Sequence, residues 1–225
     1  MLNNKQLIDN YINLKGSFRF KLDSKKSITI NKKIGRGAEA LVFEISKIND
    51  KDQSHLKWVA KIIDRDKEFR LNKLQQKILT VNHENLEKLL FIFEYEHYYL
   101  LVCEKLDFIL SNFQMLDLKN TIYVASEIIE ALIFLHKTCL IAHCDLKANN
   151  IMFSKEKKRF KLIDFNYCQH ETDFKKISLK VTLLMTSKSL LNDGHDWGYD
   201  VDIWALGSTL FKCYYGHELL EERLS

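Results

Sequence analysis

The chain has 225 residues, of which 46% are hydrophobic and 28% charged, the balance of a soluble globular protein that needs no disulfides to form a core. Its formal net charge of +4 is weak and does not indicate nucleic-acid binding, which usually needs a concentrated basic stripe. No apolar run is long enough to cross a bilayer, and the first ten residues lack the apolar core of a signal peptide.

The five cysteines are scattered along the chain and include no Cys-x-x-Cys pair. This pattern argues against a zinc ribbon or a secreted disulfide framework and favours reduced thiols. We therefore expect a cytoplasmic protein with neither a membrane nor a nucleic-acid partner. No pattern in the sequence indicates its oligomeric state.

The first half of the chain predicts antiparallel strands. Alternating apolar residues predict strands near 18–22, 28–30, 41–45 and 58–63. The apolar runs 89–95 and 98–103, parted by Glu96 and His97, predict a hairpin. Residues 67–81 contain no helix breaker and predict the one helix of this half.

The second half predicts mainly helices. Apolar residues recur at three- and four-residue steps over about 118–137, and again over about 200–215. Between them, two short apolar runs flank the basic run 155–159 (KEKKR), which we interpret as an exposed hairpin tip. The order predicts an α+β fold with a strand-rich part, a connector near 104–107 and a helical part.

A glycine-containing loop, residues 35–42 (GRGAEALV), has a predicted strand on each side. Glycines let backbone N–H groups approach phosphate oxygens closely, although a G-x-G alone usually marks a turn. Because strands precede and follow it, a strand–loop–strand cover for phosphates is favoured over the strand-to-helix turn of a dinucleotide-binding fold. Ala40 stands where a third glycine would complete G-x-G-x-x-G.

The next predicted strand carries a lysine among apolar residues, Val59-Ala60-Lys61-Ile62. Such a lysine can lie at the surface of an edge strand. A lysine on the strand after a glycine loop can instead reach phosphates as a point charge. These residues alone leave both interpretations open.

Residues 143–150 (HCDLKANN) follow the long predicted helix and precede a short strand. Asp145, Lys147 and Asn150 supply a base, a cation and an amide oxygen in one compact turn, a set that suits a hydroxyl nucleophile, a phosphate and a metal. Asp164, in Leu-Ile-Asp-Phe-Asn at the end of a buried strand, suits Mg²⁺, which prefers one or two carboxylates together with phosphate oxygens.

In this order and at these distances, the segments resemble the signature set of eukaryotic-type protein kinases over roughly residues 28–215. The resemblance implies a bilobal α+β fold. Its N-lobe, an antiparallel sheet plus one helix, would span 28–103, its hinge 104–107, and its mainly helical, shortened C-lobe 108–225. Residues 1–27 would be an N-terminal extension, whose role the resemblance leaves open.

The resemblance also implies ATP and Mg²⁺ as cofactors and a protein hydroxyl as phosphate acceptor. Asp145 would accept or orient the hydroxyl proton, and Lys147, typical of the Ser/Thr branch, would neutralise the γ-phosphate. Asn150 and Asp164 would hold Mg²⁺, Lys61 would contact the α- and β-phosphates, and Cys103 resembles the gatekeeper. The expected nucleotide-binding residues are Ile34, Gly35, Gly37, Val42, Ala60, Lys61, Glu104, Leu106 and Asn150.

Residues 200–207 (DVDIWALG) resemble the D-x-W-x-x-G start of a family helix, whose aspartate, here Asp202, supports the backbone of the catalytic loop. A carboxylate at such a position can also cap the helix itself. The two roles are compatible.

Two departures from the family pattern affect regulation. Cys144 replaces the arginine of H-R-D, which pairs with a phosphate on the activation segment. A neutral thiol cannot form that charge-assisted pair, so activity is not expected to depend on phosphorylation between Asp164 and Ser189. Asn166 replaces the glycine of D-F-G, and asparagine is the residue next most tolerant of positive φ.

Further departures keep an alternative function open. Gln75 stands near the place of the helix glutamate that should pair with Lys61, with Glu68 about two turns earlier, and Ser187-Lys188-Ser189 stands where A-P-E is expected. The chain is either a fragment or a minimal version of the domain. The intact chemical groups favour an ATP-dependent Ser/Thr protein kinase; the alternatives are a nucleotide-binding pseudokinase acting as scaffold or allosteric partner, and a structural remnant. Neither the protein substrate nor the pathway is indicated.

Overall fold

The computed structural model describes residues 15–21, 27–36, 40–48, 58–64, 78, 81–95, 97–113, 115–176, 198–217 and 219. The chain divides into two compact units. One consists of Met1–Leu71 with Lys88–Lys105, and the other of Asn72–Glu87 with Leu106–Ser225. Within the described ranges, no helix combines the length and the apolar character needed to cross a membrane.

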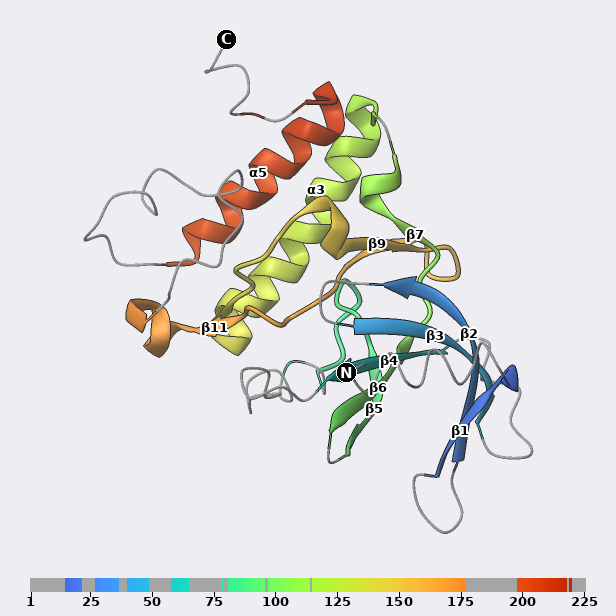
Figure 1. The fold of residues 1–225 in the computed structure, drawn as a ribbon. Helices are drawn as coiled ribbons and strands as arrows, with labels where there is room; N and C mark the ends of the chain where they lie inside the picture. Colours follow the sequence, from blue (N-terminus) through green and yellow to red (C-terminus); the bar gives the residue numbers. More distant parts are fainter. Residues whose placement is uncertain are drawn as a thin grey trace. The chain divides into compact units, whose positions relative to one another are not determined.

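The first unit is built on a six-stranded antiparallel sheet in the order β1-β2-β3-β4-β6-β5 (Figure 1). Its strands are β1 (Phe18–Lys21), β2 (Ser27–Arg36), β3 (Ala40–Ile48), β4 (Trp58–Asp64), β5 (Leu89–Glu94) and β6 (Tyr98–Glu104). The strands expected from alternating apolar residues, and the hairpin near His97, are confirmed. Strand β1 lies within 1–27 and extends the sheet by one strand.

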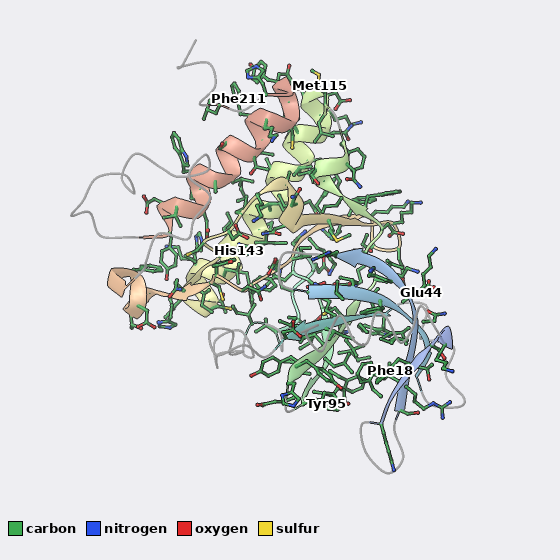
Figure 2. The ribbon with its side chains drawn as sticks, viewed as in Figure 1. Phe18, Glu44, Tyr95, Met115, His143 and Phe211 are labelled. Atoms are coloured by element: carbon green, nitrogen blue, oxygen red, sulfur yellow. The ribbon has the colours of Figure 1, made fainter. Side chains whose placement is uncertain are left out.

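One face of this sheet forms the core of the first unit. Side chains alternate between the two faces of a strand, so every second residue contributes to it. The core consists of Phe20, Ile28, Ile30, Leu41, Phe43, Ile45, Ala60, Ile62, Leu100 and Val102. Phe18, Tyr95 and Tyr98 pack against it, and Figure 2 shows Phe18 and Tyr95 among the side chains of this sheet. The stacked rings of Tyr95 and Tyr98 lie 4.7 Å apart.

The second unit contains two helices that lie side by side, α3 (Leu118–Ile133) and α5 (Asp200–Tyr215) (Figure 1). Asp117 caps the first of them by accepting a hydrogen bond from the Asn120 N–H at 2.7 Å. Both predicted helices are confirmed, with one difference. From Phe134 to Cys139 the first continues as a π-helical turn, which ends at Leu140 with a φ of 60°.

Two small antiparallel sheets complete the second unit. One pairs β7 (Phe108–Ile109), β9 (Ile151–Ser154) and β10 (Arg159–Leu162) in the order β10-β9-β7, and the other pairs β8 (Ile141–Ala142) with β11 (Gln169–His170). Short 3-10 turns occupy Leu110–Asn112, Ala148–Asn150 and Glu171–Lys176. Residues 155–158 form an exposed turn between β9 and β10, which confirms the predicted hairpin tip.

Buried polar contacts fasten residues 81–87 within the second unit. The Asn85 amide donates to Glu127 Oε2 at 2.6 Å and to the Phe160 carbonyl at 3.0 Å. The almost fully buried Lys161 donates to the Leu86 carbonyl at 2.9 Å. These bonds explain why residues before strand β5 group with the helical unit. The helix expected over 67–81 lies outside the described residues, apart from Ile78 and Val81.

Candidate active site

In the first unit, Lys61 shares one face of the sheet with a set of apolar residues. It lies directly opposite Val42 on β3 and Leu101 on β6. Val59, two residues earlier on β4, lies opposite Cys103. Directly opposed residues of an antiparallel pair point to the same face. The face therefore combines the Lys61 ammonium group with apolar residues on three neighbouring strands, and Glu44, which lies opposite Val59 on β3, adds a carboxylate.

Ala60 lies on the other face of the same strand. Its partners are Phe43 and Val102, and it is fully buried in the core of the first unit. The expectation that Ala60 and Lys61 line one nucleotide site does not fit this geometry, because neighbouring residues of a strand point to opposite faces. Val59 is the residue that shares the face of Lys61. Counting two residues back from the lysine would have identified it from the sequence.

Strands β2 and β3 flank the glycine loop, and Gly37 lies outside the described residues. The register between these strands shifts between Ile30 and Gly35, and Gly35 lies opposite Val42. Ile34 is 44% exposed. A Cβ built on Gly35 would lie 3.5 Å from the Val42 Cβ, an ordinary contact, and the φ of Gly35 is not in the left-handed region. Neither crowding nor backbone conformation in the described structure therefore requires a glycine at this position.

Strand β6 ends at Glu104, whose side chain serves the fold. Its Oε1 accepts a hydrogen bond from the Lys88 N–H at 2.6 Å, and its N–H donates to the Lys88 carbonyl at 2.9 Å. The next residue, Lys105, forms a surface ion pair of 3.2 Å with Glu44. Leu106 is half-buried and begins the second unit. The expected hinge is thus anchored on its N-terminal side by a buried carboxylate.

In the second unit, the loop 143–150 is anchored by Asp202, which is fully buried on α5. The Asp202 carboxylate accepts hydrogen bonds from the N–H groups of His143 at 2.7 Å and Cys144 at 2.9 Å. It also lies 2.8 Å from Nε2 of His136. Cys144 has a φ of 62°, a left-handed conformation that costs free energy and persists only where surrounding contacts hold it.

Helix α5 begins after Tyr199, whose side chain makes no capping hydrogen bond. The carboxylate of Asp202 is instead used on the loop. The loop-supporting role is therefore the one that the geometry shows, and the capping alternative is not. The observation also explains how a charged side chain can be fully buried, since its oxygens receive several donors.

Three side chains of the loop are in direct contact. Asn150 Nδ2 donates to the Asp145 carbonyl at 2.7 Å and to Asp145 Oδ2 at 2.9 Å. Lys147 Nζ lies 2.8 Å from both carboxylate oxygens of Asp145. The turn is closed by the Asn150 N–H, which donates to the Lys147 carbonyl at 2.8 Å. The structure thus brings together the carboxylate, the cation and the amide that their spacing predicted to be close.

Asp164 is positioned through the backbone of its neighbour. The Ile163 N–H donates to the Asn150 carbonyl at 2.9 Å, and the Ile163 carbonyl lies 3.1 Å from His143 Nε2. Asp164 itself has a φ of 65°. Left-handed conformations of residues other than glycine cluster at functional sites. Asn166 has no positive φ, so the conformational demand that we expected at Asn166 falls on Asp164 instead.

His143 links the backbone of Asp145 to that of Ile163, the residue before Asp164, a role that the sequence did not reveal. It is fully buried in the second unit (Figure 2), and its Nδ1 accepts a hydrogen bond from the Asp145 N–H at 3.3 Å. This bond assigns the ring proton to Nε2, which donates to the Ile163 carbonyl. The sequence pattern that could have indicated this role is a histidine two residues before an acidic residue, in a short loop flanked by apolar residues.

Asn150 and Asp164 fit a magnesium ion by their donor types. Both amide hydrogens of Asn150 are directed at Asp145, which leaves the amide oxygen as an acceptor for another partner. Asp164 is half-buried. An amide and a carboxylate oxygen are hard donors of the kind Mg²⁺ prefers. Across the described ranges, no group of three or more His, Cys, Asp or Glu residues could hold a metal ion.

Two buried thiols belong to this region, Cys144 within the loop and Cys168 just before strand β11. Burial, reinforced by the Asp202 carboxylate, holds the pKa of Cys144 far above its usual range. Burial likewise raises the pKa of Cys168 to about 12. Both groups are therefore neutral thiols at physiological pH. Cys144 packs with Ala142, Phe174 and Val201 in an apolar cluster.

The remaining predicted features lie outside the described residues. They are Gly37, Glu68, Gln75 and the segment that contains Ser187-Lys188-Ser189.

The family model of the Protein kinase domain matches residues 28–224. This match covers most of the chain, and it includes both the strands that carry Lys61 and the loop that carries Asp145. The α+β, protein-kinase-like fold expected from the sequence is thereby confirmed, and the chain belongs to the protein kinase family.

Proposed function

We propose that the protein transfers the γ-phosphoryl group of ATP to serine or threonine hydroxyls of protein substrates. The observation that carries this proposal is the state of Asp145. Its carboxylate is fixed by Asn150 and Lys147. The backbone of the loop is held by the buried carboxylate of Asp202 on α5. Such preorganisation is what a catalytic base needs, because phosphoryl transfer depends on positioning and electrostatics.

Asp145 would accept or orient the proton of the attacking hydroxyl. Its side chain is about 10% exposed. Lys147 is more accessible, at 31%, and its ammonium group balances the charge of Asp145. When a nucleotide is bound, the same flexible ammonium group would move toward the γ-phosphate. A lysine in this place supports the serine/threonine preference.

Asn150 and Asp164 would hold the magnesium ion, which when bound neutralises charge on the phosphates. Their relative position depends on the bond between the Ile163 N–H and the Asn150 carbonyl. His143 keeps the same backbone segment aligned with Asp145. The residues of this chain thus supply the two oxygen donors and the hydrogen bonds that orient them.

In the first unit, Lys61 would contact the α- and β-phosphates, and the apolar face around it would receive the purine. Val59 replaces Ala60 in this assignment. The backbone of 104–106 would pair with adenine. The residues proposed for nucleotide binding are Ile34, Gly35, Gly37, Val42, Val59, Lys61, Glu104, Leu106 and Asn150. The division into an extension (1–27), an N-lobe (28–103), a hinge (104–107) and a C-lobe (108–225) belongs to the same proposal.

The test compares the wild type with Asp145→Asn in two assays. Calorimetric titration with Mg-ATP measures binding, and transfer of ³²P to a generic basic protein, followed by phosphoamino-acid analysis, measures chemistry. We expect unchanged binding and a ~10²–10⁴-fold loss of transfer, the usual range for a general base. Asp117→Asn is the matched control, because asparagine caps a helix as well as aspartate does.

Three outcomes separate the alternatives. Transfer that survives Asp145→Asn would contradict the role of that residue. Binding of Mg-ATP without transfer by the wild type would support the pseudokinase. Absence of both would contradict the proposed function altogether.

A further inference from the structure

The segment that follows Asn166 is docked against the loop that carries Asp145. Strand β11 pairs with β8, with Gln169 opposite Ala142 and His170 opposite Ile141. One residue further, the Glu171 N–H donates to the Leu140 carbonyl at 3.0 Å. Backbone bonds therefore join this segment to the two residues that lead directly into His143. A displacement of the segment would therefore break these bonds or shift the start of the loop.

Side chains reinforce this docking through an apolar cluster. Cys144, Ala142, Phe174 and Val201 are buried together, and Tyr167 and Tyr199 pack against them; we call these six residues the latch cluster. They come from β8, the loop, the docked segment and the start of α5. Because Cys144 is a neutral thiol, the loop offers no cation at this position to an anion on the segment. Apolar contact replaces charge here.

Tyr199 has contacts on both sides of this cluster. Its ring forms a T-shaped contact with Phe174, with centroids 5.2 Å apart, and its hydroxyl donates to Glu171 Oε2 at 3.0 Å. On the other side, the ring stacks on His136 at 4.5 Å. His136 in turn lies 2.8 Å from the Asp202 carboxylate that anchors the loop. Tyr199 therefore joins the docked segment to the anchor of the catalytic loop.

We propose that Tyr199 is a positioning residue, which holds the segment 169–176 against the loop of Asp145 through the latch cluster. In doing so it keeps Asp145 aligned without phosphorylation of the chain. This inference rests on the proposed function for its effect on catalysis. The docking itself is a property of the fold and is measurable without activity.

The docking is tested by hydrogen exchange in full-length protein, comparing the peptide that covers 169–176 with the peptide that covers 151–162. In Tyr199→Ala, we expect exchange in 169–176 to accelerate ~10–100-fold, because local opening becomes easier. Exchange in 151–162 should stay as in the wild type. Tyr199→Phe keeps both ring contacts and loses only the bond to Glu171, so its exchange should rise less than that of Tyr199→Ala.

Tyr215→Ala is the matched control. It removes a tyrosine from the other end of the same helix, where the side chain is 54% exposed and contacts Phe211 and Tyr214. Exchange in 169–176 should not change in this variant. If Tyr199→Ala also accelerates exchange in 151–162, the unit has unfolded, and Phe174→Ala then provides the same comparison from the side of the segment. Equal exchange in 169–176 for the wild type and the variant that retains its fold would overturn the proposal.

Catalysis provides the second readout. A base displaced by about 1 Å loses ~10²-fold in rate, so we expect kcat of Tyr199→Ala to fall ~10–100-fold while the KM for ATP stays within about twofold. Tyr199→Phe should restore most of kcat, and phosphatase treatment of the wild type should change nothing. A rise in the KM for ATP with unchanged kcat, or a loss of activity on phosphatase treatment, would contradict the positioning role. A wild type that transfers no phosphate would refute the proposed function, whereas the exchange comparison would still decide the docking.

Discussion

The two units hold their functional side chains by different means. In the first, the strand that carries Lys61 is held by the apolar core on the opposite face of the sheet, through many small contacts. In the second, Asp145 depends on a chain of buried hydrogen bonds that ends at Asp202. Apolar contacts are non-directional and tolerate a change of shape, whereas a buried acceptor that loses its donors does not. Conservative substitutions should therefore lower the unfolding free energy more in the second unit than in the first.

The largest expected effect is that of Asp202→Asn. The amide keeps the shape of the carboxylate but offers one acceptor oxygen and turns an NH₂ group toward the N–H of His143 or Cys144. We expect the variant to lose about 3 kcal/mol of unfolding free energy, the cost of a buried donor left unsatisfied beside a charged network. Urea unfolding measures it.

Asp200→Asn is the control for that substitution, since it lies in the same turn of α5 and is exposed. Its unfolding free energy should change by less than about 0.5 kcal/mol, as for most surface substitutions. Similar losses of unfolding free energy in the two variants would mean that the buried hydrogen bonds of Asp202 contribute no special stability to the second unit.

The second prediction concerns pH and again involves the second unit. In the unfolded chain, the thiols of Cys144 and Cys168 titrate near their ordinary pKa of about 8.5. In the fold both pKa values are raised, that of Cys168 to about 12. Above pH ~8.5 the unfolded chain therefore releases protons that the folded chain retains, and stability falls by up to about 1.4 kcal/mol per pH unit for each thiol. Below pH ~8.5 this contribution is fully present.

Urea midpoints measured from pH 8 to 9.5 test this dependence, and the double variant Cys144→Ala, Cys168→Ala supplies the comparison. Its midpoint should fall less steeply with pH than that of the wild type. Equal slopes in the two proteins would show that other groups carry the alkaline loss of stability.

The third prediction is the counterpart of Asp202→Asn in the first unit. Phe43 is fully buried at the centre of the sheet core, and Phe43→Leu removes part of a ring while keeping the site apolar. We expect a loss of about 1.5 kcal/mol, because a core of this kind partly repacks around a smaller hydrophobic residue. Chemical denaturation followed by tryptophan fluorescence measures it. A loss as large as that of Asp202→Asn would remove the contrast between the units.

The same contrast explains what could be predicted from the sequence. Strands and helices follow from the periods of two and 3.6 residues, and the contacts of Asp145, Lys147 and Asn150 follow from spacing within one turn. Contacts between distant segments carry no such period. The bond of His143 to the Ile163 carbonyl and the contact of Tyr199 with Phe174 depend on how these segments pack, and neither was predicted.

Ala60 was expected beside the lysine for a different reason. The motif was matched by residue type, whereas the face of the strand is decided by parity. Lys61 and Ala60 are neighbours in sequence and therefore point to opposite faces, one carrying the ammonium group and the other the core. For residues on strands, position relative to the lysine is the more informative signal.

The smallest expected effect on stability is that of Gly35→Ala, and it tests whether the first unit can lose ligand binding while keeping its fold. The new Cβ would meet Val42 at an ordinary 3.5 Å, on a backbone that alanine adopts without strain. The unfolding free energy should therefore change by no more than about 0.5 kcal/mol.

If the backbone of residue 35 approaches phosphates, the added methyl group would occupy that space and weaken Mg-ATP binding about tenfold, or about 1.4 kcal/mol. Calorimetric titration measures this change, with Gly207→Ala at an exposed position of helix α5 as the control. Equal affinities for wild type and Gly35→Ala would place the phosphates elsewhere. A loss of affinity without a loss of stability would show that ligand binding and folding depend on different residues in the first unit. In the second unit, the buried hydrogen bonds that position Asp145 also stabilise the fold.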